Sequence, residues 1–373
     1  MIVTGLHLRD FRCYVNADVV LGERLTVVDG PNGAGKTNLL EALYFGCTGR
    51  SCRTANEREL VRFDAPAARV EVRGRDRAGE HTLSVGLAPG EPKRLRADGA
   101  PVERLLDVAA RPLVSVFLPD RLELVKGPPA LRRSHVDQVV AALWPARAAT
   151  RRAYTQALAQ RNALLARVRA GGSRAALAAW DLELARHGIA LRDDRARSIE
   201  LLQPRFADAA SELGLLGCPM LRYRPRSRAS APEALAAELA ERLESDLERG
   251  FTGHGPHRDD VALMRDGREL RAYGSQGEQR LALLALLLAE RTVLAEERGD
   301  PPLLLLDDVM SELDASRRQR LVARISGAGQ SVITTTDLAH VPGADDSAVV
   351  RLRVSPGGVV ELASSAPGRS LAA

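Results

Sequence analysis

Residues 30–37 of the chain read Gly30-Pro31-Asn32-Gly33-Ala34-Gly35-Lys36-Thr37, which matches the pattern G-x-x-x-x-G-K-[ST] in full. The apolar run 25–28 precedes the motif, and residues 37–45 follow it with the apolar spacing of a helix. Glycines let successive backbone N–H groups turn toward phosphate oxygens, and the helix N-terminus adds a favourable dipole. The segment therefore predicts a nucleotide-binding loop between a strand and a helix of an α/β fold.

Two side chains of this loop are expected to act on bound ATP. Lys36 should reach the β- and γ-phosphates as a catalytic group, and the Thr37 hydroxyl should hold Mg²⁺, with Asn38 completing the cofactor-binding segment. A chance match in a chain of this composition has a probability on the order of a few in a thousand. Lysine occurs only at Lys36, Lys93 and Lys126 among 53 basic residues, so its presence here favours ATP binding over a plain glycine-rich turn.

A second motif ends in two carboxylates. The run 303–306 is four leucines, typical of a buried strand, and Asp307 and Asp308 follow it directly. Taken alone, an exposed pair at a strand end is the simpler interpretation. Beside the strand that enters the phosphate loop, however, Asp307 would lie near the Mg²⁺ ligands and Asp308 would face the attacking water, which predicts a metal-binding and a catalytic role.

A third motif stands just before this strand. Ser275, Gln276, Gly277 and Glu278 open an apolar helix at 281–294. The plainer interpretation is a capping box, since Ser275 and Glu278 have its spacing. The glycine-lined helix start is also an anion site, placed as the signature motif of ABC ATPases is, which meets the γ-phosphate held by another subunit. We therefore expect these four residues to act in trans.

The bulk composition favours an intracellular chain with a polyanionic partner. At 373 residues with 45% hydrophobic residues, the chain can bury a sizeable core in two domains, and its net charge of +5 mildly favours nucleic-acid binding. The four cysteines have no paired spacing, and the N-terminus carries charges too early for a signal peptide. No apolar run reaches the roughly 20 residues of a membrane span. We expect a cytoplasmic, nucleoid-associated protein with no membrane partner.

Apolar periodicity divides the chain into three parts. Strand patterns dominate both ends of the chain, and helical patterns begin near 131 and continue to about 249. The predicted domains are the N-terminal part of an ATPase head (1–118), a mainly helical lobe (119–245) with an antiparallel helical hairpin at about 147–202, and the C-terminal part of the head (246–373).

The order of these motifs resembles the SMC-like branch of the ABC ATPases, and within it the RecF family. The likeness spans nearly the whole chain and is carried by LRDFRCY (8–14), GPNGAGKTNLLEAL (30–43), LVKGPPALRR (124–133), GPHRDD (255–260), GSQGEQR (274–280) and LLLLDDVMSELD (303–314). The resemblance puts Ser311 and Asp314 in a D-loop and brings Arg12 toward the nucleotide. An exposed arginine at a strand end is the alternative for Arg12.

The resemblance implies an ABC-type P-loop ATPase head with a mixed sheet, interrupted by a mainly helical lobe. It also implies ATP-driven homodimerisation on gapped or junction DNA of any sequence, slow Mg²⁺-dependent hydrolysis that releases the DNA, and cooperation with RecR and the RecA-loading machinery. Departures from the usual ABC pattern are consistent with slow hydrolysis. Asp308 stands where glutamate is usual, Thr335-Thr336-Asp337 with nearby His340 replaces a clear switch histidine, and no convincing Q-loop glutamine is found.

The stretch from Arg147 to Arg174 contains seven arginines and no acidic residue. A solvated helix face would explain it, but a lack of acids also suits phosphate contact, and Arg147, Arg151 and Arg152 are the candidates for DNA binding. His254 and His257 have H-x-x-H spacing, yet without further ligands they argue against zinc rather than for it.

A different class of function remains open. The chain could be a nucleotide-dependent protein scaffold of the ABC class without a direct DNA role. Binding to gapped DNA with and without ATP distinguishes the two functions.

Overall fold

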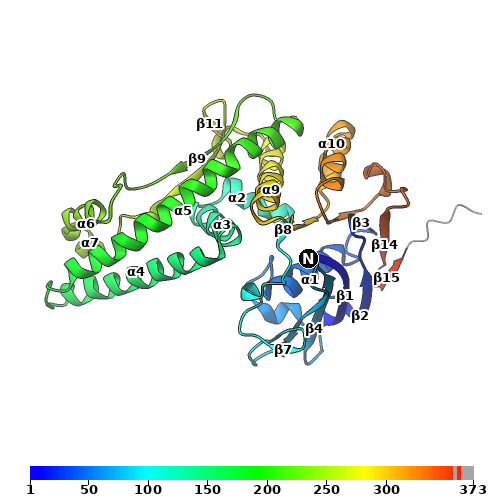
Figure 1. The fold of residues 1–373 in the computed structure, drawn as a ribbon, viewed down its shortest axis with the longest axis horizontal. Coiled ribbons are helices and arrows are strands. Elements are labelled where there is room, and N and C mark those ends of the chain that lie inside the picture. The colour runs from blue at the N-terminus through cyan, green and yellow to red at the C-terminus, as the bar shows by residue number, and fades with distance from the viewer. Residues whose placement is uncertain (356–358, 363–373) are drawn as a thin grey trace, which may run out of the picture. The chain divides into compact units, whose positions relative to one another are not determined.

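The computed structural model describes residues 1–355 and 359–362. Contacts divide the chain into two compact units: a head unit of Met1–Asp120 with Leu294–Ala373, and a helical unit of Arg121–Val293 (Figure 1). The helical unit starts near the predicted boundary at 118 but runs on past 245. The physical reason is that residues 260–265 form a strand that pairs with a strand beginning at Pro219.

The head unit contains an antiparallel sheet in the order β2-β1-β4-β5-β6-β7. Its strands are β1 (Ile2–Phe11), β2 (Tyr14–Val20), β4 (Ala68–Arg75), β5 (Glu80–Leu87), β6 (Arg94–Ala97) and β7 (Ala100–Pro101). Along β4, Val70 and Val72 are buried while Arg69 and Arg73 are exposed. This alternation is typical of a sheet with one face on the core and the other in solvent.

The second sheet of the head unit is mixed, as predicted, and has the order β15-β14-β3-β13-β12-β8. Its strands are β3 (Leu25–Asp29), β8 (Val114–Phe117), β12 (Leu303–Leu306), β13 (Ser331–Thr335), β14 (Val349–Ser355) and β15 (Val359–Leu362). All neighbours are parallel except β15, which is antiparallel to β14. Parallel strands end at one edge, so the residues that follow β3, β12 and β13 come together there.

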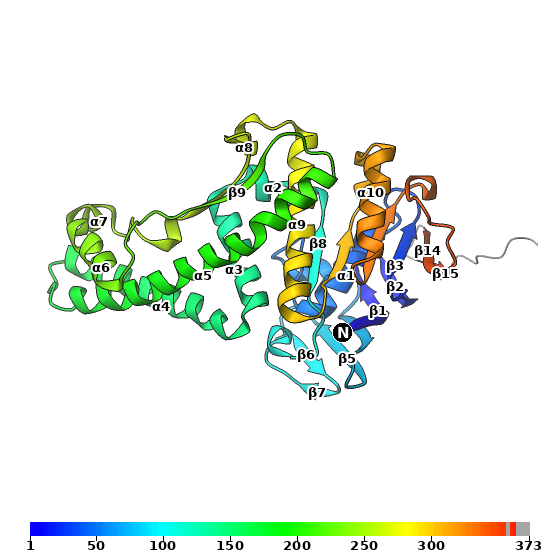
Figure 2. The same ribbon diagram turned by 45° about the horizontal axis from the view of Figure 1, so that its top comes forward.

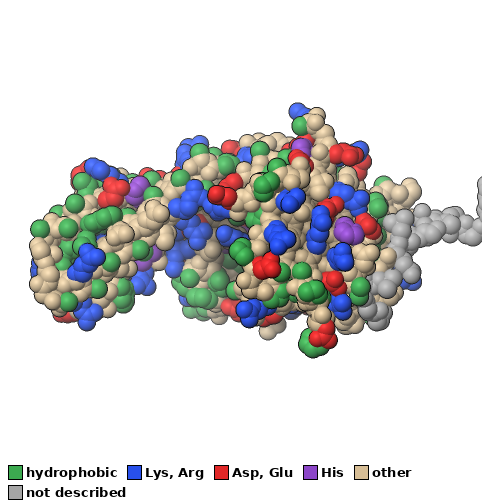
Figure 3. All heavy atoms as spheres, turned by 90° about the horizontal axis from the view of Figure 1, so that it is seen from below, with side chains coloured by type: hydrophobic (Ala, Val, Ile, Leu, Met, Phe, Trp, Pro, Cys, Tyr) green, Lys and Arg blue, Asp and Glu red, His purple; other side chains and the backbone are tan. Residues whose placement is uncertain are grey.

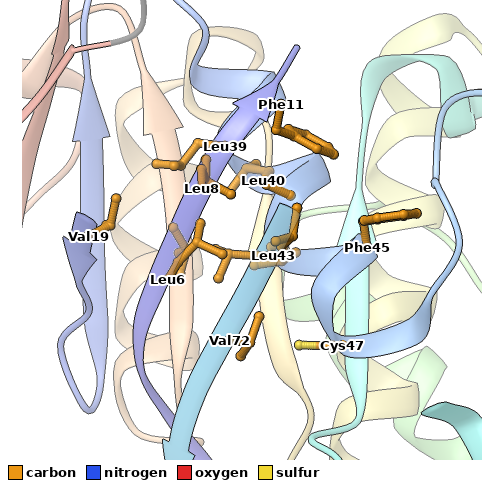
Figure 4. Close-up of a cluster of buried hydrophobic side chains, with 14 of the residues drawn as sticks. Leu6, Leu8, Phe11, Val19, Leu39, Leu40, Leu43, Phe45, Cys47 and Val72 are labelled. Atoms are coloured by element: carbon orange, nitrogen blue, oxygen red, sulfur yellow. The ribbon is translucent and has the colours of Figure 1, made fainter. Parts of the chain in front are cut away.

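Helix α1 (Lys36–Thr48) packs against the antiparallel sheet through apolar side chains (Figure 4). Leu39, Leu40 and Leu43 are fully buried, and each such leucine contributes about 1.5–3 kcal/mol. Gly46 lets the helix approach, since a Cβ there would lie 2.4 Å from Val72 Cγ2. This packing fixes the helix that begins at the phosphate loop. The head unit also contains α10 (Ala315–Ser326).

The helical unit is built on a pair of contacting helices, α4 (Ala148–Arg169) and α5 (Leu177–Glu212), in the segment where the sequence predicts a hairpin (Figure 2). The other helices are α2 (Glu123–Lys126), α3 (Pro129–Leu143), α6 (Pro232–Glu241), α7 (Leu243–Arg249), α8 (Leu270–Tyr273) and α9 (Gln276–Arg298), which belongs to this unit as far as Val293. The helical patterns that continue to about 249 thus end in two separate helices, α6 and α7, with a break at Arg242.

A three-stranded antiparallel sheet in the order β11-β10-β9 completes the helical unit. Its strands are β9 (Pro219–Arg224), β10 (Asp260–Arg265) and β11 (Arg268–Glu269). Residues 222–224, the last residues of β9, belong to a segment that is polar in sequence. Arginines on the solvent side of β9 hide its alternation with the inward-facing Leu221.

Candidate nucleotide site and signature loop

The phosphate loop connects β3 to α1, as its motif predicts. Gly35 is the N-cap of α1 with φ 116°, and no side chain caps this helix. Gly30 packs on β14 so closely that a Cβ would lie 2.2 Å from the Val354 carbonyl oxygen. An uncapped helix N-terminus leaves backbone N–H groups without acceptors, and these groups bind phosphate oxygens well. The local backbone therefore has the form of an anion site.

Lys36 lies at the root of the loop and is buried. Its Nζ donates to the carbonyl oxygens of Gly30 at 2.7 Å and Pro31 at 3.0 Å. Burial lowers the pKa of Lys36, while nearby carboxylates, Asp308 foremost, act in the opposite direction. A phosphate at the loop would add a negative charge beside the ammonium and favour its charged form.

Asp307 joins the phosphate loop to the acidic strand. Its Oδ2 accepts a hydrogen bond from Thr37 Oγ1 at 2.8 Å, and its Oδ1 accepts one from Thr334 Oγ1 at 2.7 Å. The residue is only 6% exposed. The parallel order of β3, β13 and β12 brings these three side chains to one edge of the sheet, where sequence analysis expected Thr37 and Asp307 to meet.

The oxygens of Thr37 and Asp307 fit Mg²⁺. This ion is usually held by one or two protein oxygens together with phosphates and water, rather than by a full protein cage. Within the described part of the chain, no group of three or more His, Cys, Asp or Glu side chains could hold a metal ion. A Mg²⁺ ion held by Thr37 and Asp307 would take its other ligands from nucleotide and solvent, as is usual for this ion.

Asp308 follows with a backbone in the left-handed region, φ 46°. Its N–H donates to Thr334 Oγ1 at 3.0 Å, and its carbonyl accepts from Ser311 Oγ at 2.8 Å. Among the described residues, its buried Oδ1 has no hydrogen-bond partner. Buried polar atoms almost always have partners, so an open carboxylate oxygen marks a place for a water or ligand.

Arg12 is bound to helix α1. Its Nε and Nη2 donate to the two carboxylate oxygens of Glu41, both at 2.9 Å, and the Glu41 side chain is fully buried. Arg53 donates to Glu41 at 3.3 Å and to Asn38 Oδ1 at 3.0 Å. The alternative of an exposed strand-end arginine is therefore wrong for Arg12, because its side chain is only 18% exposed. Both arginines therefore hydrogen-bond to the first two turns of α1, Arg12 through Glu41 and Arg53 through Glu41 and Asn38.

The signature segment forms the capping box. Ser275 N–H donates to Glu278 Oε2 at 2.8 Å, and Glu278 N–H donates to Ser275 Oγ at 3.3 Å. The Ser275 hydrogen bond lowers the pKa of Glu278, which also pairs with Arg265. Gln276 and the unobstructed Gly277 are exposed in the first turn of α9. The capping interpretation is correct, and it leaves this helix end open to an anion.

Gln279 holds the signature loop from within. It is 4% exposed, and its Nε2 donates to the carbonyl oxygens of Leu270 at 2.8 Å and Gly274 at 3.0 Å. A buried amide that bridges two carbonyls on one loop restricts that loop to one conformation. Gln279 therefore connects α8 to the signature.

The segments after β12 and β13 form tight turns. Asp314 caps α10 by accepting from Arg317 N–H at 2.9 Å. Thr335 Oγ1 donates to the Asp337 carbonyl at 2.8 Å, so these residues of the expected switch position stabilise a turn. His340 keeps a buried Nδ1 that has no hydrogen-bond partner among the described residues.

The arginines predicted to contact DNA differ in their surroundings. Arg147 pairs with Asp194, and Arg151 lies 3.2 Å from Asp137. Arg152 is exposed. Arg161 of the same acid-free stretch is fully buried, so it cannot contact DNA. Acids distant in sequence thus neutralise much of a charge that looks unbalanced along the chain.

The GPHRDD segment binds the helices of the helical unit together. Asp259 accepts hydrogen bonds from Tyr223, Arg195 and the Arg226 N–H, and Asp260 makes two hydrogen bonds with Arg132, at 2.8 and 3.0 Å. His257 Nε2 donates to the Thr252 carbonyl at 2.9 Å, which leaves Nδ1 to accept from Tyr154 at 2.7 Å. His254 pairs with Glu238. Both histidines therefore have structural partners.

Four residues at these sites escaped sequence analysis. Thr334 bridges Asp307 and the Asp308 amide, Gln279 fixes the signature loop, Arg53 bonds Asn38, and Asp29 pairs with Arg353 at 3.0 Å. Asp29 could have been identified from the sequence, because it directly precedes the phosphate-loop motif. The others have no such signal, because their partners are distant in sequence or are backbone atoms.

Comparison with known proteins agrees with the geometry. A family model described as an AAA domain matches residues 5–88. The DNA replication and repair protein RecF of Anaeromyxobacter sp. (strain Fw109-5) is 42% identical over 348 residues, covering 90% of this chain and 93% of that protein. The protein of the same name from Myxococcus xanthus (strain DK1622) is 39% identical over 380 residues, covering 98% and 99%. No helix of the described residues combines the length and the apolar character needed to cross a bilayer.

Solved structures give the same result. The recombination mediator protein RecF with ATP, in the RecFOR pathway, matches with a TM-score of 0.86 and 28% identity over 97% of this chain and 98% of that one. An Smc head bound to the C-winged helix domain of ScpA has a TM-score of 0.60 at 16% identity over 97% of each chain, and shares the fold alone. The predicted α/β, ABC-type class is confirmed. The chain belongs to the RecF family of DNA replication and repair proteins.

Proposed function

We propose that this chain is an ATP-dependent DNA-binding protein of recombinational repair and replication-fork maintenance. The observation that carries the proposal is the convergence of an uncapped helix N-terminus, Lys36, Thr37 and Asp307 at one sheet edge. A relative of known structure binds ATP, which supports the same ligand here. The predicted head domain, completed by segments from both ends of the chain, is part of this proposal.

ATP binds along residues 30–38. The free N–H groups at the start of α1 face its phosphates, and Lys36 exchanges its loop carbonyls for the β- and γ-phosphates. Mg²⁺, when bound, neutralises charge on the phosphates, held by Thr37 and through the carboxylate of Asp307. Arg12 and Asn38, already joined at the helix start through Glu41 and Arg53, lie beside the nucleotide.

Asp308 orients or deprotonates the attacking water. Its open, buried Oδ1 supports that role. Its side chain is one methylene shorter than the glutamate usual in ABC ATPases, which makes hydrolysis slow. A slow ATPase is suited to a switch that holds DNA for as long as ATP remains intact.

ATP closes two copies of the chain head to head. The bare first turn of α9, with Ser275 to Glu278, meets the γ-phosphate of the other copy, and the D-loop residues Ser311 and Asp314 line the same interface. DNA with a gap or junction binds the closed dimer without sequence preference. Membership of the RecF family supports cooperation with RecR and the RecA-loading machinery, in the cytoplasm and near the nucleoid. Figure 3 shows Lys and Arg side chains gathered near the middle of one face, with others spread over the rest of it.

Gel-shift binding to gapped DNA, with and without ATP, tests the function. We expect ATP and Mg²⁺ to strengthen binding, and Ser275→Arg to retain ATP binding but lose the ATP-dependent dimer in light scattering. Lys36→Arg should lose both, because guanidinium does not fit a loop built for a compact ammonium. ATP-dependent dimers that never bind DNA would instead favour the protein scaffold.

A further inference from the structure

The sheet of the helical unit carries arginines on one side. Residues 222–228 read Arg222-Tyr223-Arg224-Pro225-Arg226-Ser227-Arg228, and β9 pairs Arg222 with Ala262 and Arg224 with Asp260. Alternate residues of a strand point to opposite faces. Leu221 is buried and lines a small pocket together with the buried Val261 and Leu263, so that face points into the unit. The arginines of β9 therefore lie on the outer face.

A hollow of about 620 Å³ opens beside this outer face, within the range of small-ligand sites. Arg224, Arg268 and Arg271 line it, against a single carboxylate, Glu269. At its rim Tyr273 is 69% exposed, and the Arg268 guanidinium lies 5.8 Å from the centre of its ring. An exposed aromatic ring next to planar cations is the usual platform for an unpaired base.

The positive charge around this hollow is largely unneutralised. Among the described residues, Arg222, Arg226, Arg228 and Arg268 form no ion pair within 4 Å of a carboxylate. Arg224 and Arg271 share the one acid of the hollow. By contrast, Arg147, which directly precedes α4, pairs with Asp194, and Arg151 of α4 pairs with Asp137, which Arg195 also contacts. Phosphate binding depends on charge that is free to displace counterions, which favours the sheet over α4.

We propose that this hollow binds unpaired nucleotides of a DNA strand, on the single-stranded side of a gap or junction. One base stacks on Tyr273, and Arg268, Arg271 and the exposed arginines of 222–228 contact the phosphates. A base stacked inside a duplex cannot reach the ring, so the hollow distinguishes unpaired from paired DNA. The inference rests on the proposed function, since it names the surface and the DNA form that function uses.

The hollow is also joined to the signature loop. Tyr273 ends α8, and the Gln279 amide ties both Leu270, at the start of α8, and Gly274 to the signature helix. If a bound DNA strand restricts the motion of α8, it also restricts the motion of the signature segment that begins at Ser275. Binding of unpaired DNA should consequently be stronger in the ATP-bound state.

The test is fluorescence anisotropy with a labelled oligothymidylate, a duplex of equal length and a gapped duplex, in Mg²⁺ and ATP over a range of salt. Tyr273→Ala should weaken oligothymidylate binding by roughly 5- to 150-fold, the range for losing one stacked base, and duplex binding by less than about 2-fold. Tyr273→Phe should retain the affinity.

The charge is tested by a matched pair of double variants. Arg268→Gln with Arg271→Gln should flatten the slope of log K against log salt on oligothymidylate by up to about 1.4, or about 0.7 for each lost phosphate contact. Arg147→Gln with Arg151→Gln removes as much charge from the start of α4 and the residue before it, and should change the slope less. Far-ultraviolet circular dichroism confirms that each variant is folded; tryptophan fluorescence would not, because Arg147 lies 4.8 Å from the centre of the Trp144 ring.

The outcomes separate this inference from the proposed function. A wild type that binds gapped DNA, with both hollow variants unchanged, would overturn the inference alone. A wild type that binds none of the three DNAs would overturn both. If Tyr273→Ala also lost the ATP-dependent dimer without DNA, Tyr273 would belong to the signature loop, and the inference would again be wrong.

Discussion

The phosphate loop and the GPHRDD segment are both polar, glycine-containing and highly specific in sequence, yet their polar groups end in opposite states. At the phosphate loop, α1 has no cap and one oxygen each of Asp29 and Asp308 has no partner among the described residues. In the helical unit, His257 uses both ring nitrogens and Asp259 accepts three side-chain or backbone donors.

This difference separates binding from architecture. Buried polar groups are nearly always satisfied in folded proteins, so a place where several stay open is a place kept for a ligand. A place where all are satisfied rigidifies the fold. The GPHRDD segment, which helps to identify the family, therefore holds the helical unit together through its polar groups.

The largest effect is expected from substitutions at the phosphate loop, where polar groups lack partners. Asp308→Asn keeps the size of the side chain but removes its charge, so ATP hydrolysis should fall by roughly 10²–10⁴-fold while ATP binding and dimer closure persist. Asp307→Asn should instead weaken Mg²⁺-dependent closure. Single-turnover hydrolysis and dimer lifetime by light scattering measure both. Near-normal hydrolysis by Asp308→Asn would mean that another residue, Glu312 or His340, positions the attacking water.

The next effect breaks the closed network. Arg161 is fully buried and donates to Asp181 at 2.6 Å, Asp246 at 2.7 Å and Thr252 Oγ1 at 2.8 Å. Arg161→Met would leave two carboxylates buried without their cation and should destabilise the helical unit by about 3–5 kcal/mol in urea unfolding followed by tryptophan fluorescence. Exposed Arg167→Met on the same helix should cost under about 0.5 kcal/mol. Equal effects would show that the network is not stabilising.

The dependence of stability on pH tests one residue of the GPHRDD segment, His257. Burial lowers the pKa of His257 to about 4, so the folded state keeps a neutral ring where the unfolded chain takes up a proton. Stability is fully present above about pH 6.5 and should fall by up to about 3 kcal/mol as the pH drops toward 4. His257→Gln should flatten this dependence in urea unfolding, whereas His187→Gln, near the surface beside Glu183, should retain it.

The smallest expected effect concerns Gln279, a buried, hydrogen-bonded residue that supports the open end of the signature helix. Gln279→Leu removes two donors from buried carbonyls, each worth about 1 kcal/mol net, and loosens the signature loop. ATP-dependent dimerisation should weaken by about 5- to 30-fold, with the affinity of the monomer for ATP unchanged. Analytical ultracentrifugation with and without ATP measures this. An unaltered dimer would mean that the capping box alone fixes the loop.

The sequence alone determined what local patterns can encode. The phosphate loop, its flanking strand and helix, the buried strand 303–306 and the capping box depend on neighbours within a few residues, and each has the predicted form. The family followed from the same motifs and is confirmed by relatives at 39–42% identity.

Only the tertiary structure decided which side chains are partners. Thr334 meets Asp307 because β12 and β13 are parallel neighbours, and no spacing in the chain records this. An acid-free run of arginines looked like one charged surface, yet Asp137, Asp194 and Asp181 pair with three of its members from other parts of the chain. The physical reason is that charge and hydrogen bonding act through space: the sequence fixes the groups that are present, and the fold decides which of them remain free.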